Sequence, residues 1–130
     1  MDILAKNAPH ENALIVTALD ARRGLIYCSS YKNERGALKR KSEYALLSLE
    51  EFIKKFKKGP VILGDAVSVY GDKFLSAIKG ARLLDKDYWF PETHNLMTLA
   101  LEKARTGRSS SVLTVKPIYL YPKECQIKTK

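Results

Sequence analysis

The chain has 130 residues, of which 45% are hydrophobic and 28% are charged, and its formal net charge is +9. This length is enough for one domain with a hydrophobic core and too short for two, and the composition is ordinary for a globular protein. No apolar run approaches the roughly 20 residues of a membrane-spanning helix, and no secretory signal is visible at the N-terminus. We therefore expect a single domain over residues 1–130, without a membrane partner.

The cysteine count and the charge pattern bear on compartment and partners. Cys28 and Cys125 do not make a disulfide framework or a metal-binding spacing, which favours a reducing, cytoplasmic compartment. Basic residues gather in three places: 39–41, 54–58 and the tail, where they are Lys123, Lys128 and Lys130. Such clusters suit RNA, including tRNA, or another polyanion, but they are also typical of solvated helix faces. The sequence leaves both interpretations open.

The stretch Ala13 to Tyr31 predicts a β-hairpin. Its first apolar run, Ala13 to Leu19, is polar only at Thr17, as in a strand buried on both faces. In the second run Leu25, Tyr27, Ser29 and Tyr31 alternate with Ile26, Cys28 and Ser30, which indicates a strand with two distinct faces. The two runs are joined by a charged tip that ends in Gly24, a residue that readily adopts positive φ.

The middle of the chain alternates strands with helices. Lys32 to Lys41 is expected to be a charged connection, and Ser42 to Leu47 a third strand. Ser48 and Glu51 have the spacing of a capping box. They predict a helix with an inner face of Leu49, Phe52, Ile53 and Phe56 and an end at Gly59-Pro60. A buried strand, Val61-Ile62-Leu63, follows, and after it a helix whose inner residues are Tyr70, Phe74, Leu75 and Ile78, frayed or restarted at Gly71-Asp72.

The last third is predicted to hold a weak strand at Ala81 to Leu84 and a helix from Thr93 to Thr106. The inner residues of that helix are expected to be Leu96, Met97, Leu99, Ala100, Leu101 and Ala104, and Gly107 is expected at its C-terminal cap. Val112 to Leu120 is extended and apolar. The element order β-β-β-α-β-α-β-α predicts an α/β domain with a five-stranded mixed sheet. This is the ribonuclease H-like fold, which is also half of the actin-like ATPase fold.

In that fold the first and fourth strands end side by side, and here these ends carry Asp20 and Asp65. Paired carboxylates there could bind Mg²⁺ and cleave a phosphodiester. The alternative is that Asp20 orders the hairpin tip and Asp65 caps the next helix, since Asp suits both positions. A nuclease needs a further acid, and none stands at a convincing position, so the structural alternative is favoured. A basic RNA-binding module is a third hypothesis.

Other polar residues give weaker signals. Arg22 and Arg23 beside Gly24 could bind a phosphate or a carboxylate, or pair locally with Asp20, and the sequence does not decide between these. His10 and His94 have no acid or cysteine at metal-ligand spacing, so we expect no metal site. Cys28 is expected to be a small core residue. With no catalytic motif and no cofactor-binding motif, we expect neither an enzyme nor a cofactor.

The block LDARRGLIYCSSY, Leu19 to Tyr31, resembles the second half of the TsaB (YeaZ) family of the actin-like, glycoprotease-like superfamily. The similarity continues through VILGDA (61–66), the helix from Pro91 to Ala104 and the closing PIYL (117–120). The resemblance implies a non-catalytic protein that supports a TsaD-like catalytic subunit and a TsaE-like ATPase in making threonylcarbamoyladenosine on tRNA. It also makes Asp20, Arg22, Arg23 and Gly24 the family motif.

The chain departs from the family pattern at Leu25, where an acid is frequent, and at Tyr121, where Arg is usual. The family's N-terminal half is absent, and Met1 to Ala5 matches the helix that joins the two halves. The chain is therefore expected to be a fragment of a longer protein or a separately encoded half. A lone second half would expose apolar surface, so we expect self-association, with a homodimer formed through Val112 to Leu120 or a sheet edge.

Overall fold

A computed structural model describes residues 1–9, 12–107, 111 and 113–121. His10, Val112 and Cys125, and the tail lysines Lys123, Lys128 and Lys130, lie outside these ranges. The helices are α1 (Asp2–Ala5), α2 (Leu49–Lys55), α3 (Ala66–Ala77) and α4 (Thr93–Arg105), with a short 3-10 helix at Lys86–Tyr88. The strands are β1 (Leu14–Asp20), β2 (Leu25–Glu34), β3 (Ala37–Arg40), β4 (Ala45–Ser48), β5 (Val61–Leu63) and β6 (Arg82–Leu83).

One mixed sheet forms the centre of the structure. Its order is β3-β2-β1-β5-β6, with β4 also paired to β2. Strand β1 is antiparallel to β2 and parallel to β5, which in turn is parallel to β6. The sheet and its helices give the predicted α/β architecture of the ribonuclease H-like half of the actin-like fold. Within the described ranges, no helix combines the length and the apolar character needed to cross a bilayer.

The sheet has six strands where five were predicted, because the segment from Lys32 to Lys41 is not a connection. Strand β2 continues to Glu34, turns at Arg35 and Gly36, which both have positive φ, and returns as β3. Strand β3 pairs with the second half of β2, and β4 pairs with its first half. Strand β4 overlaps the predicted third strand, Ser42 to Leu47, and β3 is the additional strand. The exposed Lys39 and Arg40 of β3 obscured its strand pattern in the sequence.

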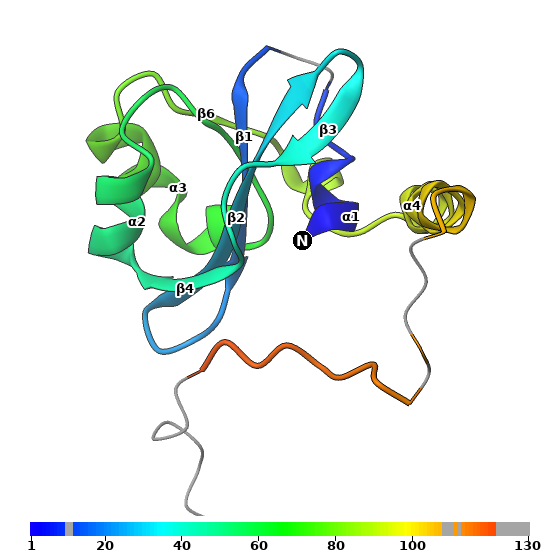
Figure 1. The fold of residues 1–130 in the computed structure, drawn as a ribbon. Coiled ribbons are helices and arrows are strands. Elements are labelled where there is room, and N and C mark those ends of the chain that lie inside the picture. The colour runs from blue at the N-terminus through cyan, green and yellow to red at the C-terminus, as the bar shows by residue number, and fades with distance from the viewer. Residues whose placement is uncertain (10–11, 108–110, 112, 122–130) are drawn as a thin grey trace, which may run out of the picture.

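Helices α2 and α3 cover one face of the sheet (Figure 1). This face matches the predicted alternation: Val16, Ala18, Ile26 and Cys28 are all buried there. The ring of Phe52 on α2 lies 4.8 Å from that of Phe56 and 4.8 Å from that of Phe74 on α3. The capping box predicted at the start of α2 is present, with both Ser48–Glu51 hydrogen bonds formed. This side of the molecule is a dry, aromatic core.

The other face carries α1 and, farther out, α4 (Figure 1). Leu4, Ala5 and Ala8 pack here against Ile15 and Tyr31 of the sheet. The predicted inner face of α3 is confirmed at Tyr70, Phe74 and Ile78 and is wrong at Leu75, which is 53% exposed. The predicted inner face of α4 is wrong, because only Leu99 of the six expected inner residues is even half-buried. The periodicity of α4 is real, but the main contact of the helix is with the short α1, so its apolar side has little to cover it. Gly107, at φ +66, follows α4 as predicted.

Gly64, directly after β5, has the least room for a side chain of the seven glycines. Its φ is +120°, and a Cβ built on it would lie 2.2 Å from the carbonyl oxygen of Ala18 in β1. A side chain there clashes with the backbone of the central strand rather than with a flexible neighbour. We expect Gly64→Ala to lower the free energy of unfolding by about 3 kcal/mol or more, measured by urea denaturation.

Gly24→Ala is the matched control, because Gly24 also has positive φ (+76°) but no atom within 4 Å of the added Cβ. That variant should lower the free energy of unfolding by only about 1 to 2 kcal/mol, which is the cost of placing a residue with a Cβ at positive φ. Equal losses in the two variants would contradict the steric argument.

Candidate functional site

The family motif lies at the tip of the β1–β2 hairpin. Arg22, Arg23 and Gly24 all have positive φ, at 66°, 53° and 76°. The Leu25 N–H donates to the Arg22 carbonyl, and the Ala21 N–H donates to the Leu25 carbonyl. Arg23 and Gly24 are the two central residues of the turn that this Leu25–Arg22 hydrogen bond closes, and positive φ at both central positions suits a tight hairpin. Both arginine side chains point to solvent, and that of Arg22 is 87% exposed.

Asp20 and Asp65 do meet, as the fold predicts, but each acts on the backbone. The Asp65 carboxylate accepts a hydrogen bond from the Asp20 N–H at 2.9 Å. The Asp20 carboxylate accepts one from the Arg22 N–H at 2.9 Å, and its second oxygen lies 3.4 Å from the Arg22 guanidinium. Asp20 therefore orders the tip. The prediction that Asp65 caps α3 is wrong, because its side chain makes no capping hydrogen bond and ties β5 to β1 instead.

The remaining candidate residues are scattered. His94 is exposed and pairs with Glu92 at 2.9 Å. Cys28 is fully buried in β2, where burial raises the pKa of its thiol to about 11, so it stays protonated and unreactive near neutral pH. Among residues 1–9, 12–107, 111 and 113–121, no group of three or more His, Cys, Asp or Glu side chains is placed to hold a metal ion.

The segment after α4 returns to the hairpin tip. The Tyr121 hydroxyl donates a hydrogen bond to the Ala21 carbonyl, and its ring meets that of Tyr27 edge-on at 5.9 Å. Tyr121 thus fastens the end of the described segment to the motif. The sequence marked Tyr121 only as a departure from the family pattern, because a contact 100 residues apart leaves no local signal.

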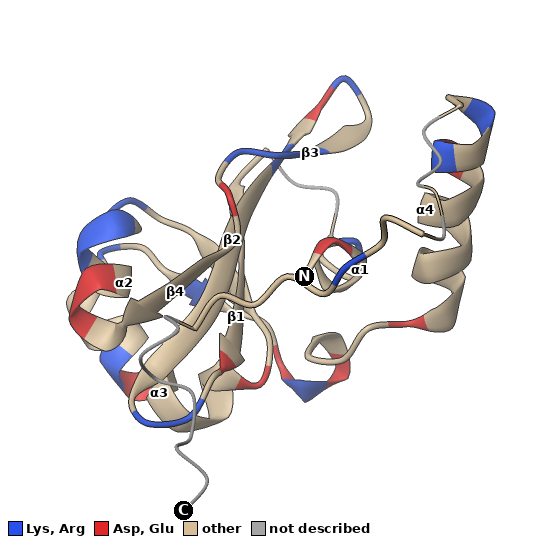
Figure 2. Ribbon diagram, turned by 60° about the horizontal axis from the view of Figure 1, so that its bottom comes forward, with Lys and Arg blue, Asp and Glu red and all other residues tan. Residues whose placement is uncertain are grey.

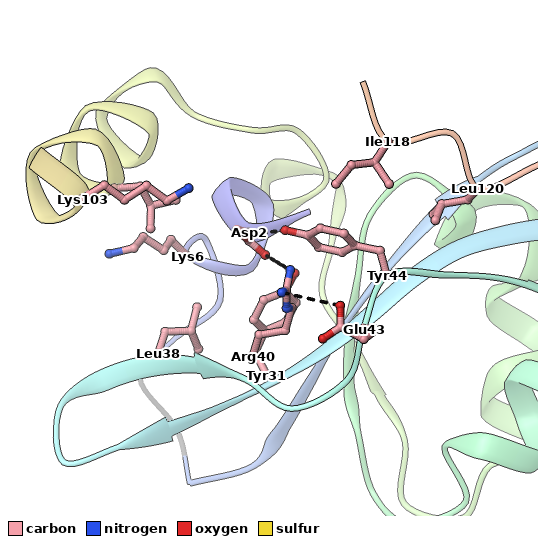
Figure 3. Close-up of a pocket in the computed structure, with 11 residues that line it drawn as sticks. Asp2, Lys6, Tyr31, Leu38, Arg40, Glu43, Tyr44, Lys103, Ile118 and Leu120 are labelled. Atoms are coloured by element: carbon pink, nitrogen blue, oxygen red, sulfur yellow. Dashed lines mark hydrogen bonds and ion pairs between the residues drawn. The ribbon is translucent and has the colours of Figure 1, made fainter. Parts of the chain in front are cut away.

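A groove of about 640 Å³ opens on the α1 face, between α1, strands β2 and β3 with the loop that follows β3, α4 and the returning segment (Figure 3). Leu38, Leu99, Ile118 and Leu120 supply its apolar lining. Its polar lining comes from Asp2, Lys6, Tyr31, Arg40, Glu43, Tyr44 and Lys103. The groove therefore combines apolar walls with a dense polar floor.

The carboxylate of Asp2 contacts several of the other polar residues in the groove lining. Its carboxylate accepts hydrogen bonds from the hydroxyls of Tyr31 at 2.7 Å and Tyr44 at 2.6 Å. The Arg40 guanidinium lies 4.0 Å from Asp2, 3.7 Å from Glu43, and 4.3 Å from the centre of the Tyr44 ring. Burial alone would raise the pKa of Asp2, but the two hydroxyls and Arg40 outweigh it and lower that pKa. Burial, and the hydrogen bond to Asp2, raise the pKa of Tyr44 to about 12.

Large apolar side chains are exposed on α4 and on the returning segment. On α4 these are Leu96, Met97 and Leu101, and on the returning segment they are Leu113, Val115, Ile118 and Tyr119. We call these seven residues the α4–tail surface. Exposed large apolar side chains in such number are typical of a surface that another protein covers. Charged groups of the groove border it, so the site as a whole has the composition of an interface.

The fold and the site together define the class: a domain with the ribonuclease H-like half of the actin-like fold and an interface-like groove. The chain is similar to two solved structures from Pseudomonas aeruginosa. One, described as a protein with similarity to peptidase YeaZ, has a TM-score of 0.68 and 21% sequence identity over 92% of this chain. The other, YeaZ, has a TM-score of 0.67 and 20% identity over 91%. The resemblance to the YeaZ family is thus confirmed at the level of the fold.

This chain spans 56% of the length of each of those two structures. No family model and no curated protein matches the sequence. At about one-fifth sequence identity, the structural similarity establishes the fold but not the activity.

We expect Arg22→Ala and Arg23→Ala to change the free energy of unfolding by no more than about 0.5 kcal/mol each, because both side chains are exposed. Asp20→Ala should lower the free energy of unfolding by a larger amount, because it leaves the Arg22 N–H without its acceptor and removes the hydrogen bond that orders the tip. Thermal unfolding followed by circular dichroism measures all three. A drop of many degrees for either arginine variant would show that this arginine has a structural role.

The Asp2 carboxylate, with its partners Tyr31, Tyr44 and Arg40, makes the free energy of unfolding depend on pH in the acid range. The pKa of Asp2 is below its ordinary value of 3.8 in the folded chain, so the ionised carboxylate stabilises the fold above that value. This contribution is lost as the pH falls through the folded pKa. We expect the wild type to lose more stability than Asp2→Asn between about pH 5 and about pH 2 in urea titrations. Parallel stability curves for the two proteins would contradict this role of Asp2.

Proposed function

We propose that this chain is a non-catalytic interaction domain of a YeaZ-like protein. In this role it supports a TsaD-like catalytic subunit and a TsaE-like ATPase, in the cytoplasm, in making threonylcarbamoyladenosine on tRNA. The observation that carries the proposal is the match to the YeaZ fold over 92% of the chain. The family motif at the hairpin tip and the α4–tail surface are consistent with it.

The α4–tail surface indicates how the domain is used. Leu96, Met97 and Leu101 project from one helix that the rest of the chain leaves largely uncovered. The YeaZ structures contain a further part that this chain does not span. We propose that a domain of that kind, on the same polypeptide or on another, packs against the α4–tail surface, and that the pair binds the TsaD-like subunit.

The motif at the hairpin tip has a supporting role in this proposal. Asp20 and Asp65 use their carboxylates to hold backbone N–H groups, and this leaves Arg22 and Arg23 displayed on a rigid turn. Displayed arginines suit the carboxylates of a protein partner. We propose that the chain contributes no chemistry of its own to the modification reaction.

Reconstitution tests the function. A TsaD-like protein, a TsaE-like protein, the first domain of a YeaZ-like protein and tRNA are incubated with ATP and a preformed, activated threonylcarbamoyl donor, with and without this chain. We expect modified adenosine only when the chain is present. Modification that does not depend on the chain would contradict the proposal, as would tRNA cleavage by the chain alone with Mg²⁺ that Asp20→Asn abolishes.

A pair of matched variants tests the surface. Leu101 on α4 and Leu75 on α3 are both 53% exposed, but they lie on opposite sides of the sheet. We expect Leu101→Asp to abolish the complex with the first domain and Leu75→Asp to leave it intact, measured by size exclusion with light scattering. The chain alone, run in parallel, shows whether copies associate through the same surface. Equal behaviour of the two variants would place the contact elsewhere.

A further inference from the structure

A second surface lies on the opposite side of the molecule, where the ends of α2 and α3 meet. Five exposed lysines gather here: Lys54, Lys55, Lys57, Lys58 and Lys79. We call them the lysine cluster. Figure 2 shows the basic residues at the C-terminal end of α2 and in the loop that follows it.

The backbone brings the two parts of the cluster together. The Gly59 N–H donates to the Lys79 carbonyl at 3.1 Å, and the Arg82 N–H donates to the Pro60 carbonyl at 2.9 Å. The loop after α2 and the turn after α3 are therefore held side by side. Residues 52–64 and 73–84 contain no Asp or Glu, so two acid-free segments share one end of the domain.

In the part of the chain that the structure describes, none of the five lysines lies within ion-pair distance of a carboxylate, whereas Lys6, Lys39 and Lys41 all do. Hydrogen bonds from Ser48 lower the pKa of Glu51, and the charge of the neighbouring Lys54 only adds to that effect. Lys54 and Lys55 can offset the negative end of the helix dipole of α2. Lys57 and Lys58 lie beyond that helix, and Lys79 lies beyond α3, so this explanation does not cover them.

The residue types in and around the lysine cluster favour a nucleic acid over a protein or a membrane as its partner. Protein interfaces favour arginine and aromatic residues and are depleted in lysine, and segment 54–60 has no exposed aromatic residue because Phe56 is buried. Basic sites that dock on membranes add apolar side chains that insert, and here Phe56 and Pro60 both face inward. Compact ammonium charges on flexible stems suit the spaced phosphates of a nucleic acid backbone.

We propose that the lysine cluster binds the phosphate backbone of RNA, without reading its sequence. The cluster lies on the α2–α3 side of the sheet, and the α4–tail surface lies on the other. RNA and a protein partner can therefore be bound at the same time. The inference stands on charge and placement alone, so it does not depend on the partner proposed above.

Fluorescence anisotropy with labelled unfractionated tRNA tests the proposal between about 50 and 200 mM salt. The variant Lys57→Gln/Lys58→Gln/Lys79→Gln should bind at least about tenfold more weakly than the wild type. The slope of log affinity against log salt concentration should also be smaller, by the equivalent of about two to three phosphate contacts. The matched control, Lys32→Gln/Lys86→Gln/Lys116→Gln, removes the same charge from exposed lysines elsewhere and should bind nearly as the wild type does. Replacing the three cluster lysines by arginine should restore binding.

Three results would overturn the proposal. One is equal weakening in the two glutamine variants, which would show that only net charge matters. Another is no binding of tRNA by the wild type at the lowest salt. The third is tighter binding of the wild type to vesicles of equal parts phosphatidylserine and phosphatidylcholine than to tRNA, lost in the cluster variant, which would assign the surface to membranes. Circular dichroism confirms that each variant is folded.

Discussion

The close approach of Gly64 to the backbone of Ala18 is the constraint on which the rest of the structure depends. It sets β5 against β1 at the point where the chain leaves the sheet for α3. The hydrogen bond from the Asp20 N–H to Asp65 then fixes the same corner, two residues farther along β1 and one residue beyond Gly64. The hairpin tip and the start of α3 are positioned by this pair of contacts. A side chain at Gly64 would displace the central strand, and with it both faces of the sheet.

The two faces of the sheet are covered to very different degrees. On one, three phenylalanine rings from α2 and α3 close over the strands and exclude water. On the other, the short α1 makes a small core around Tyr31, and beyond it lie the polar floor built on Asp2 and the exposed side of α4. The larger buried core therefore lies on the α2–α3 face, and the groove and most of the exposed apolar side chains lie on the other.

Local and periodic signals in the sequence predicted much of the fold. The buried run of β1, the alternation of β2 and the Ser48–Glu51 capping box each depend on neighbouring residues, and each is present in the structure. The juxtaposition of Asp20 and Asp65 followed from the topology, but their hydrogen-bond partners did not. Strand β3 was missed because Lys39 and Arg40 on an exposed edge strand look like loop residues.

The rest of the site depends on contacts that are distant in the chain. Asp2 meets Tyr31 and Tyr44, and Tyr121 meets Ala21, across separations that no spacing rule describes. The apolar side of α4 was assigned to the core because periodicity shows that a helix has such a side, but not what covers it. The same periodic pattern is found in a helix that packs in the core and in a helix whose apolar side binds another protein.

The divided edge of the sheet has a consequence for solubility and assembly. A long, flat edge strand invites a strand from another molecule and leads to aggregates. Here the edge beside β2 is split between β3 and β4 and carries charged side chains at Lys39 and Arg40, and the opposite edge, β6, has only two residues. Neither edge offers a length over which a foreign strand could pair well. Assembly through side chains of the α4–tail surface is thereby favoured over open-ended strand addition, so contacts between molecules of this fold are expected to be finite and specific.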